Sequence, residues 1–213
     1  MVRIRAASAA DSAQIAAVQR EGWFAAYSHL IPTVIIDRVT VPDGGARVRQ
    51  SFRVRPWQRM IVAVAGDRDQ PGEAQSGKAR PGEARPARVP AGKPGERIVG
   101  YASYGPETDV LSAPWPHPRT AAGEQGRTGE LYALYVHPAW WSTGTGRALM
   151  GRVLAATAAA EYESVVLWVL RDNTRARRFY ERAGFTPDGA TNVLETLGSV
   201  PEVRYQRALD PRL

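Results

Sequence analysis

The sequence contains no cysteine among its 213 residues. Disulfides, thiolate metal sites and a cysteine nucleophile are therefore excluded. Histidine is scarce, and His29, His117 and His137 are too scattered to fall at the spacing of metal ligands. We expect no metal cofactor.

Long hydrophobic runs are also missing. No apolar stretch approaches the roughly 20 residues that cross a bilayer as a helix, and the first five residues lack the apolar core of a signal peptide. These absences predict a cytoplasmic protein with no membrane partner. Hydrophobic residues make up 44% and charged residues 23% of the chain, as in ordinary globular proteins. The length suits one well-buried core, so we expect a single domain over residues 1–213.

Basic residues outnumber acidic ones by 28 to 21, which gives a formal net charge of +7. Such a surface attracts anions, and a nucleic acid or a phosphorylated cofactor would both fit. A basic composition with no specific target is the third reading. Because the arginines are spread along the whole chain, the sequence favours the other two readings over nucleic-acid binding.

Two segments are rich in glycine and proline. Residues 66–97 contain the tripeptide Pro-Gly-Glu three times, at Pro71, Pro81 and Pro94, and have almost no branched aliphatic side chains to bury. This composition predicts a flexible insertion. Residues 105–129 carry four prolines and predict a long surface loop.

The remaining residues show the patterns of regular structure. Asp11 and Gln14 form a helix-start box, and Gly184 is typical of a helix end. Antiparallel strands come first, and a strand–helix–strand–helix pattern follows, which predicts a mixed α/β sheet with a parallel central pair, flanked by helices. The insertion would lie in a hairpin connection. Strands are expected at 3–5, 60–65, 98–104, 130–136, 165–170 and 200–208, and helices from about 11 to 27, from about 147, and at 174–183.

Gly144 and Gly146 stand where a helix is expected to begin. Glycines at a helix start let backbone N–H groups approach an anion closely, and the positive end of the helix dipole favours phosphate there. A tight turn that needs two small residues would produce the same pattern.

A second polar stretch follows the apolar run 165–170. Asn173 stands at the expected start of a helix, and Phe179 and Tyr180 lie two turns further on. By default Asn173 would cap the helix, Phe179 would pack in the core, and Tyr180 would be a half-buried packing residue.

Together these motifs resemble the acetyl-CoA motifs of the GCN5-related N-acetyltransferase (GNAT) superfamily. The resemblance rests on the run Leu-Tyr-Ala-Leu-Tyr-Val-His-Pro, on the Gly144-x-Gly146 turn, on Asn173, and on Phe-Tyr-x-x-x-Gly-Phe, in this order. It covers about residues 130–187, with weaker likeness in 4–27 and 201–205. The resemblance implies a GNAT fold and an acetyl-CoA co-substrate.

The residues that would hold acetyl-CoA form three groups. The side chain of Asn173 would bond the pantetheine arm. Backbone groups of the preceding strand would pair with that arm, namely those of Leu134, Tyr135 and Val136. Backbone amides of the glycine turn would hold the pyrophosphate, namely those of Ser142, Thr143, Gly144, Gly146 and Arg147.

The turn departs from the family pattern at three places. Trp141 and Ser142 stand where the family has an arginine or glutamine followed by glycine, and Thr145 replaces a branched aliphatic residue. The side-chain contact with the pyrophosphate that the family residue would make is therefore not expected here. The backbone cradle needs N–H groups rather than a particular side chain and is unaffected.

Two side chains are candidates for proton transfer. The resemblance places Tyr180 beside the coenzyme sulfur, where it would protonate the departing thiolate. Glu130 is the candidate base, because strand alternation would turn its side chain to the same face as Leu134 and Val136, and it matches a catalytic glutamate of several family members. The alternative is that Glu130 only solvates the end of a strand.

Few features of the sequence indicate the acceptor. By resemblance, the N-terminal helices and the last hairpin would form its cleft, which points to Trp23, Phe24, Tyr27 and Tyr104. Aromatic walls suit cationic or apolar amines, and the same residues could equally belong to the core. No acidic cluster in the sequence indicates a polycationic acceptor.

The resemblance therefore predicts an N-acetyltransferase that moves the acetyl group of acetyl-CoA directly to an amine in a ternary complex. The acceptor would be a small molecule, a peptide or protein N-terminus, or a lysine. A non-catalytic module that senses acyl-CoA is the alternative, and it would need neither Glu130 nor Tyr180. A homodimer is compatible with either reading.

Overall fold

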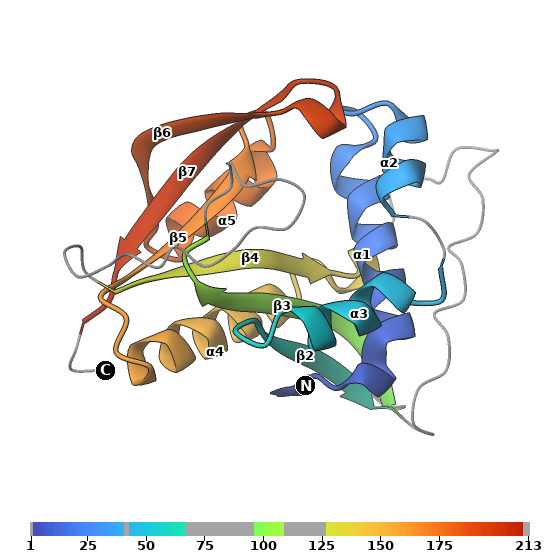
Figure 1. Ribbon diagram of the computed structural model, residues 1–213, viewed down its shortest axis with the longest axis horizontal. Coiled ribbons are helices and arrows are strands. Elements are labelled where there is room, and N and C mark those ends of the chain that lie inside the picture. The colour runs from blue at the N-terminus through green and yellow to red at the C-terminus, as the bar shows by residue number, and fades with distance from the viewer. Residues whose placement is uncertain (1, 41–42, 67–95, 109–126, 211–213) are drawn as a thin grey trace.

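The computed structural model describes residues 2–40, 43–66, 96–108 and 127–210. One seven-stranded sheet runs through these residues in the order β1-β2-β3-β4-β5-β7-β6 (Figure 1). Neighbouring strands pair antiparallel except β4 and β5, which are parallel. This is the predicted mixed sheet with a parallel central pair. The strands are β1 (Arg3–Ala6), β2 (Arg59–Gly66), β3 (Glu96–Pro106), β4 (Thr128–Val136), β5 (Ser164–Leu170), β6 (Thr186–Leu194) and β7 (Val200–Ala208).

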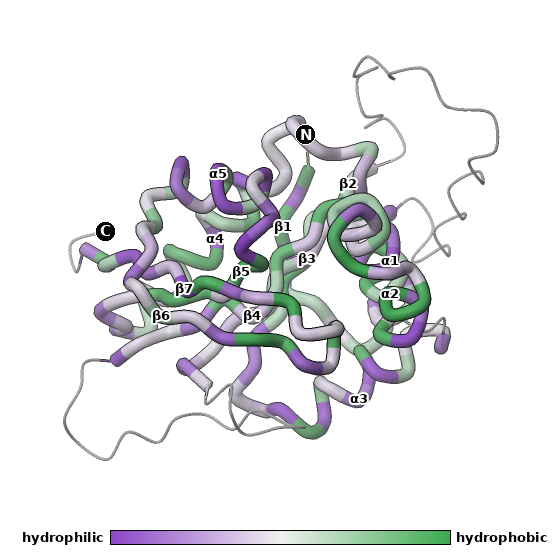
Figure 2. The backbone as a smooth tube through the Cα atoms, turned by 90° about the horizontal axis from the view of Figure 1, so that it is seen from above, coloured by the Kyte–Doolittle hydropathy of each residue, from purple (hydrophilic) through white to green (hydrophobic). Residues whose placement is uncertain are grey.

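Helices cover both faces of the sheet because its strands alternate apolar side chains between two sides. On one side, Ile15 and Val18 of α1 pack against Val62 and Tyr101 of the strands. On the other side, α4 and α5 cover a larger apolar cluster that includes Leu149. Figure 2 shows α1 and α2 next to one another at one end of the sheet. The helices are α1 (Ser12–Tyr27), α2 (Thr33–Val39), α3 (Ala46–Val54), α4 (Thr145–Ala159) and α5 (Thr174–Arg182).

The strands reach further than the sequence patterns predicted. Gly66 ends β2, and Glu96 and Arg97 begin β3, so both edges of the predicted insertion are strand. The edges of the predicted loop are strand as well, because β3 continues to Pro106 and β4 begins at Thr128. The rest of both segments, 67–95 and 109–126, lies outside the described residues. The insertion does join two antiparallel neighbours, as expected of a hairpin connection.

Three elements had no counterpart among the predicted ones. They are the short helices α2 and α3 and the strand β6. The residues of β6 include proline and glycine, and most of its side chains are exposed, so neither propensity nor apolar alternation indicated a strand. Its partner β7 is what holds it, through the register from Thr186–Gln206 to Leu194–Val200.

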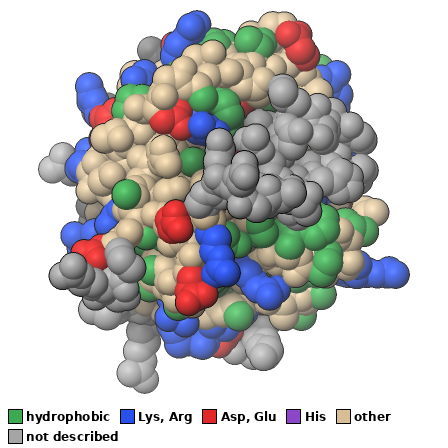
Figure 3. All heavy atoms as spheres, turned by 60° about the vertical axis from the view of Figure 1, so that its left-hand side comes forward, with side chains coloured by type: hydrophobic (Ala, Val, Ile, Leu, Met, Phe, Trp, Pro, Cys, Tyr) green, Lys and Arg blue, Asp and Glu red, His purple; other side chains and the backbone are tan. Residues whose placement is uncertain are grey.

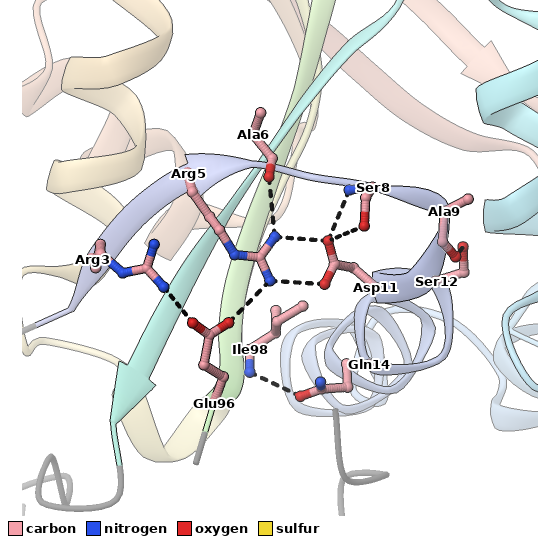
Figure 4. A network of polar contacts seen from close by, with 10 residues as sticks. All are labelled: Arg3, Arg5, Ala6, Ser8, Ala9, Asp11, Ser12, Gln14, Glu96 and Ile98. Atoms are coloured by element: carbon pink, nitrogen blue, oxygen red, sulfur yellow. Dashed lines mark hydrogen bonds and ion pairs between the residues drawn. The ribbon is translucent and has the colours of Figure 1, made fainter. Parts of the chain in front are cut away.

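A polar network fixes α1 to the sheet (Figure 4). The Arg5 guanidinium donates to both carboxylate oxygens of Asp11 at 2.8 Å and reaches Glu96 of β3 at 3.4 Å. The hydrogen bonds from Arg5 lower the pKa of Asp11. One turn later, the backbone N–H of Ile98 donates to Gln14 at 2.9 Å. These contacts anchor the start of α1 on β3. They thereby fix the direction in which the helix runs toward the candidate site.

No helix in the described part of the chain is long and apolar enough to cross a membrane. Within the same residues, no three histidine, aspartate or glutamate side chains gather in a way that could hold a metal ion.

Candidate active site

A cleft opens where β4 and β5 separate. The two strands pair only from Thr128–Ser164 to Glu130–Val166. Beyond Glu130, the described pairings join β4 to β3 and β5 to β7. The cleft has a volume of about 1090 Å³, and its lining includes residues of α1, β4, β5 and β7, the N-terminal end of α4 and the whole length of α5. Most of the predicted site residues line this one cavity, and Phe24, Tyr104 and Thr143 do not.

The loop before α4 presents backbone N–H groups at one end of the cleft. Ser142 and Gly144 have positive φ angles of 63° and 89°, and no side chain caps the helix after Gly144. The first N–H groups of a helix have no partner within it, and the helix dipole adds positive potential. A Cβ added to Gly146 would lie 3.4 Å from the ring of Phe179 on α5, so glycine also lets the two helices approach. This geometry suits an anion.

Four of the five residues predicted for this cradle line the cleft, namely Ser142, Gly144, Gly146 and Arg147. Thr143 does not, and its hydroxyl donates to the carbonyl of Trp140 at 2.8 Å. The side chain of Thr143 thus serves the loop rather than the cavity.

The C-terminal half of β4 turns one edge to the cleft. His137 donates its backbone N–H to Val99 of β3 at 2.9 Å, so by strand alternation Tyr135 also bonds toward β3, whereas Leu134 and Val136 face away from it. Leu134 and Val136 therefore turn backbone groups toward the cleft, as the predicted pairing with an extended ligand requires. Tyr135 turns its backbone groups toward β3 and lines the cleft with its side chain. The Val136 carbonyl already accepts a hydrogen bond from the Trp141 indole at 2.8 Å.

Asn173 is both a helix cap and a cleft residue. Its side-chain oxygen accepts a hydrogen bond from the backbone N–H of Ala176 at 3.1 Å, which confirms the capping role expected by default. The residue is 8% exposed and lines the cleft beside Tyr27. The cap fixes the position of the side chain in the cleft wall.

Glu130 lies at the vertex of the split. It is only 4% exposed, and one carboxylate oxygen accepts hydrogen bonds from the backbone N–H and the hydroxyl of Thr108, both at 2.8 Å. Burial raises the pKa of Glu130 to about 7, against the lowering effect of the Thr108 hydrogen bonds. A carboxyl group with this pKa can accept and release a proton near neutral pH. Glu130 is thus buried in the cleft wall and does not merely solvate a strand end.

The strand-alternation argument for Glu130 was wrong. Tyr104 pairs with Leu131 and Ser103 with Ala133, so Tyr132 is an extra residue in β4. A bulge of this kind reverses the alternation. Leu131, not Glu130, joins Leu134 and Val136 in the cluster under α4. Glu130 instead reaches the cleft from the face on which α1 lies.

Tyr180 lines the cleft from α5. Its ring makes edge-to-face contacts with Phe179 and Phe185, with centroids 5.3 and 6.1 Å apart. Burial raises the pKa of the Tyr180 hydroxyl, so this group stays protonated at neutral pH. A protonated phenol in the cavity is able to donate a proton or a hydrogen bond.

Of the four residues predicted for the acceptor, Trp23 and Tyr27 line the cleft. Phe24 does not, because successive helix residues turn by about 100°; it packs toward α2 under the guanidinium of Arg20, 4.8 Å from the ring centroid. Tyr104 is also misplaced by the prediction, because it contacts the cluster under α4 on the opposite face of the sheet.

The sequence reading missed Glu202. It lies on β7 opposite Leu170 of β5, and its side chain lines the cleft. Burial raises the pKa of Glu202 to about 7, and the nearby charge of Glu130 adds to this effect. Its one hydrogen bond within the described residues is a long one, 3.5 Å from the Asn192 amide. The alternation of β7 could have indicated its face, but nothing in the sequence pairs it with Glu130, 72 positions earlier.

Comparisons with known proteins agree with this geometry. The profile of the "Acetyltransferase (GNAT) family" matches residues 60–185. A mycothiol acetyltransferase of Beutenbergia cavernae is 47% identical over 60 residues, which is 28% of this chain and 20% of that protein. A Mycobacterium tuberculosis protein named "Probable N-acetyltransferase" is 25% identical over 209 residues, 96% of this chain and 92% of that one. The chain thus spans only a fifth of the mycothiol enzyme, but nearly all of the second relative.

Among solved structures, the PaiA N-acetyltransferase of Thermoplasma acidophilum in complex with coenzyme A is similar, with a TM-score of 0.58. The two share 15% identity, and the match covers 98% of this chain and 99% of that one. At this identity the likeness shows the fold.

Proposed function

The chain belongs to the GNAT family of acetyltransferases, and we propose that it transfers the acetyl group of acetyl-CoA directly to a primary amine in a ternary complex. The observation that carries this proposal is the split between β4 and β5. It places a buried carboxyl group, Glu130, at the vertex of a cleft whose far end is the uncapped N-terminus of α4.

The cleft residues fit acetyl-CoA. Uncapped N–H groups around Gly144 and Gly146 suit the pyrophosphate. The free edge of β4 at Leu134 and Val136 suits the amide groups of the pantetheine arm, in the manner of an added strand. Asn173 would bond the same arm. A volume of about 1090 Å³ accommodates the arm together with an acceptor.

Acetyl-CoA supplies an activated thioester, whose C–S bond breaks as the amine nitrogen bonds to the acetyl carbon. An amine arrives as an ammonium with a pKa near ~10.4, so it must lose a proton first. Glu130, with a pKa of about 7, takes that proton when it is ionised. Tyr180 remains protonated and donates its proton to the sulfur. The nitrogen loses a second proton as it becomes an amide, and this proton balances the one that Tyr180 gives up. Burial of both groups keeps competing water away.

The acceptor side of the cleft favours a cation. Glu130 and Glu202 both line it, and within the described residues neither forms an ion pair. The rings of Trp23, Tyr27 and Trp168 complete the walls, and aromatic faces attract ammonium groups. We therefore propose a primary ammonium next to an apolar or aromatic group as the acceptor class. The mycothiol name belongs to a relative that matches over 60 residues only, so it selects no acceptor here.

A nucleic-acid partner gains little support. On the face in Figure 3, Lys and Arg side chains lie interspersed with Asp and Glu side chains rather than in one basic stripe. If the protein binds nucleic acid only weakly and unspecifically, and modest salt abolishes that binding, then the binding reflects the net charge of +7 and not a specific site.

A thiol-release assay tests the proposal. The purified protein and acetyl-CoA are mixed with a panel of monoamines, diamines, amino acids, peptide N-termini and aminoglycosides, and free thiol is followed with time. We expect amine-dependent thiol release and an acetylated product of matching mass. Binding of acetyl-CoA by calorimetry without turnover of any amine would instead support the acyl-CoA sensor.

A further inference from the structure

Three arginines form a stripe along α5. Arg175, Arg178 and Arg182 stand at positions i, i+3 and i+7, which share one face of a helix, and all three line the cleft. Arg177 points elsewhere, donating to the hydroxyl of Tyr205 at 2.9 Å. Figure 2 shows α5 as a largely hydrophilic helix. The cleft-facing side of α5 is therefore strongly basic.

The first arginine of the stripe is stacked on the loop before α4. The Arg175 guanidinium lies over the ring of Trp141, 4.1 Å from its centroid. Trp141 is itself fixed, because its indole N–H donates to the Val136 carbonyl at 2.8 Å. The stack thus places the positive charge of an α5 side chain next to the loop before α4.

Stacking leaves the hydrogen-bonding capacity of Arg175 unused. A guanidinium has its donors in its own plane, so a ring against one face does not block them. Within the described residues, no acceptor or carboxylate partner bonds Arg175. A pre-positioned planar cation beside uncapped helix amides matches the bidentate geometry of phosphate.

We propose that Arg175, held in place by Trp141, binds the pyrophosphate of acyl-CoA from the α5 side, opposite the backbone amides of α4. This inference rests on the proposed function, because it assumes that acyl-CoA occupies the cleft. Trp141 carries no charge and acts as a platform. The positive side chain at this point of the site then comes from α5 rather than from the loop itself.

The test is the affinity for coenzyme A measured by calorimetry. Arg175→Ala should weaken binding about tenfold, as expected for one charge-assisted contact at a partly exposed site. The control is Arg152→Ala, which removes the same charge from an exposed position of α4 outside the cleft; its affinity should equal that of the wild type. Rising salt should narrow the gap between Arg175→Ala and wild type, because salt screens the contact.

A comparison of coenzyme A with 3′-dephospho-coenzyme A shows which phosphate Arg175 contacts. Both contain the pyrophosphate, so Arg175→Ala should weaken their binding by the same factor. If Arg175→Ala weakens the binding of coenzyme A but not that of the 3′-dephospho compound, the assignment is overturned and Arg175 contacts the 3′-phosphate instead.

A double-mutant cycle tests the platform. If Trp141 acts by holding Arg175, Trp141→Leu should weaken binding in the wild type but add little in Arg175→Ala. Arg175→Ala with wild-type affinity, or fully additive effects, would overturn the inference. Failure of the wild type to bind coenzyme A would instead count against the proposed function.

Discussion

The two ends of the cleft are built in different ways. The cofactor end comes from one continuous stretch of chain, from the end of β4 through α4 and β5 to α5, and its proposed contacts are largely backbone groups. The acceptor end gathers side chains from distant elements, such as Trp23 of α1, Glu130 of β4 and Glu202 of β7.

This difference predicts how each end responds to substitution. Backbone N–H groups remain when a neighbouring side chain changes, so the proposed cradle does not require the family's residues at Trp141 and Ser142. Added bulk or negative charge in the turn should weaken cofactor binding. The acceptor end depends on individual side chains, so single conservative substitutions there should alter amine recognition or proton transfer without touching cofactor affinity.

The largest effect is expected at the cofactor end. Gly146→Asp introduces a side chain 3.4 Å from Phe179 and a negative charge beside the pyrophosphate. We expect coenzyme A affinity to fall more than about 100-fold, the combined cost of crowding against the Phe179 ring and of charge repulsion. Gly151→Asp is the matched control, because it places the same residue in α4 where nothing lies within 4 Å. Equal affinities in two folded variants would remove the phosphate cradle from this loop.

Tyr180→Phe should separate chemistry from binding. The change removes one hydroxyl and keeps the ring contacts with Phe179 and Phe185. With an amine identified by the thiol-release panel, kcat should fall about 100-fold, the usual size for loss of a general acid. Coenzyme A affinity should change little. Tyr162→Phe, outside the cleft, serves as the control. If the Phe variant turns over like the wild type while chemistry is rate-limiting, Tyr180 is not the acid.

Glu130→Gln should change the pH profile. A base must be ionised, so wild-type kcat/KM should rise as pH increases through about 7, the pKa of Glu130. The Gln variant can still accept the Thr108 hydrogen bonds but cannot take a proton. We expect roughly a 10- to 100-fold deficit at neutral pH that shrinks toward pH 10, where more amine is already neutral. A wild-type profile in the variant would assign the base elsewhere.

The contrast between the two ends also explains what the sequence revealed. The cofactor end was predictable because a glycine turn, an uncapped helix and the Asn173 cap are local features. Their order along 130–187 carried the resemblance to the GNAT superfamily, and that resemblance placed them, together with Tyr180, at one site. The mixed sheet was predictable because the apolar runs that indicate its strands are also local features.

The acceptor end escaped prediction where distant residues decide the geometry. The bulge at Tyr132 depends on the pairing of β4 with β3, and it reversed the face of Glu130. Glu202 faces the cleft because β7 pairs with β5. Phe24 is next to Trp23 in the chain, yet it packs under Arg20 because α2 lies on that side. Arg20 and Phe24 are neighbours on α1, but the packing of α2 on that side and the two strand pairings join residues far apart in the sequence.

The smallest effect is expected from Glu202→Gln, which changes a side chain of the acceptor end only. Its carboxylate lies at the acceptor end with Glu130 and Tyr27 as nearby titratable groups. If it attracts the ammonium group, its loss should raise the KM for the amine about three- to tenfold, the size of one partly screened ion pair. Coenzyme A affinity and kcat should stay near wild type. Glu163→Gln, exposed and outside the cleft, is the matched control.

The pH dependence distinguishes this role from that of Glu130. The pKa of Glu202 is raised to about 7, so its negative charge grows as pH rises through that value. Wild-type KM should therefore fall between pH 6 and pH 8 (about one unit on either side of that pKa), and Glu202→Gln should lose that trend while keeping the kcat profile set by Glu130. Because the charge of Glu130 raises the pKa of Glu202, removing Glu130 should lower the pKa of Glu202. A variant with unchanged KM at both pH values would show that the acceptor approaches Glu130 without contacting β7.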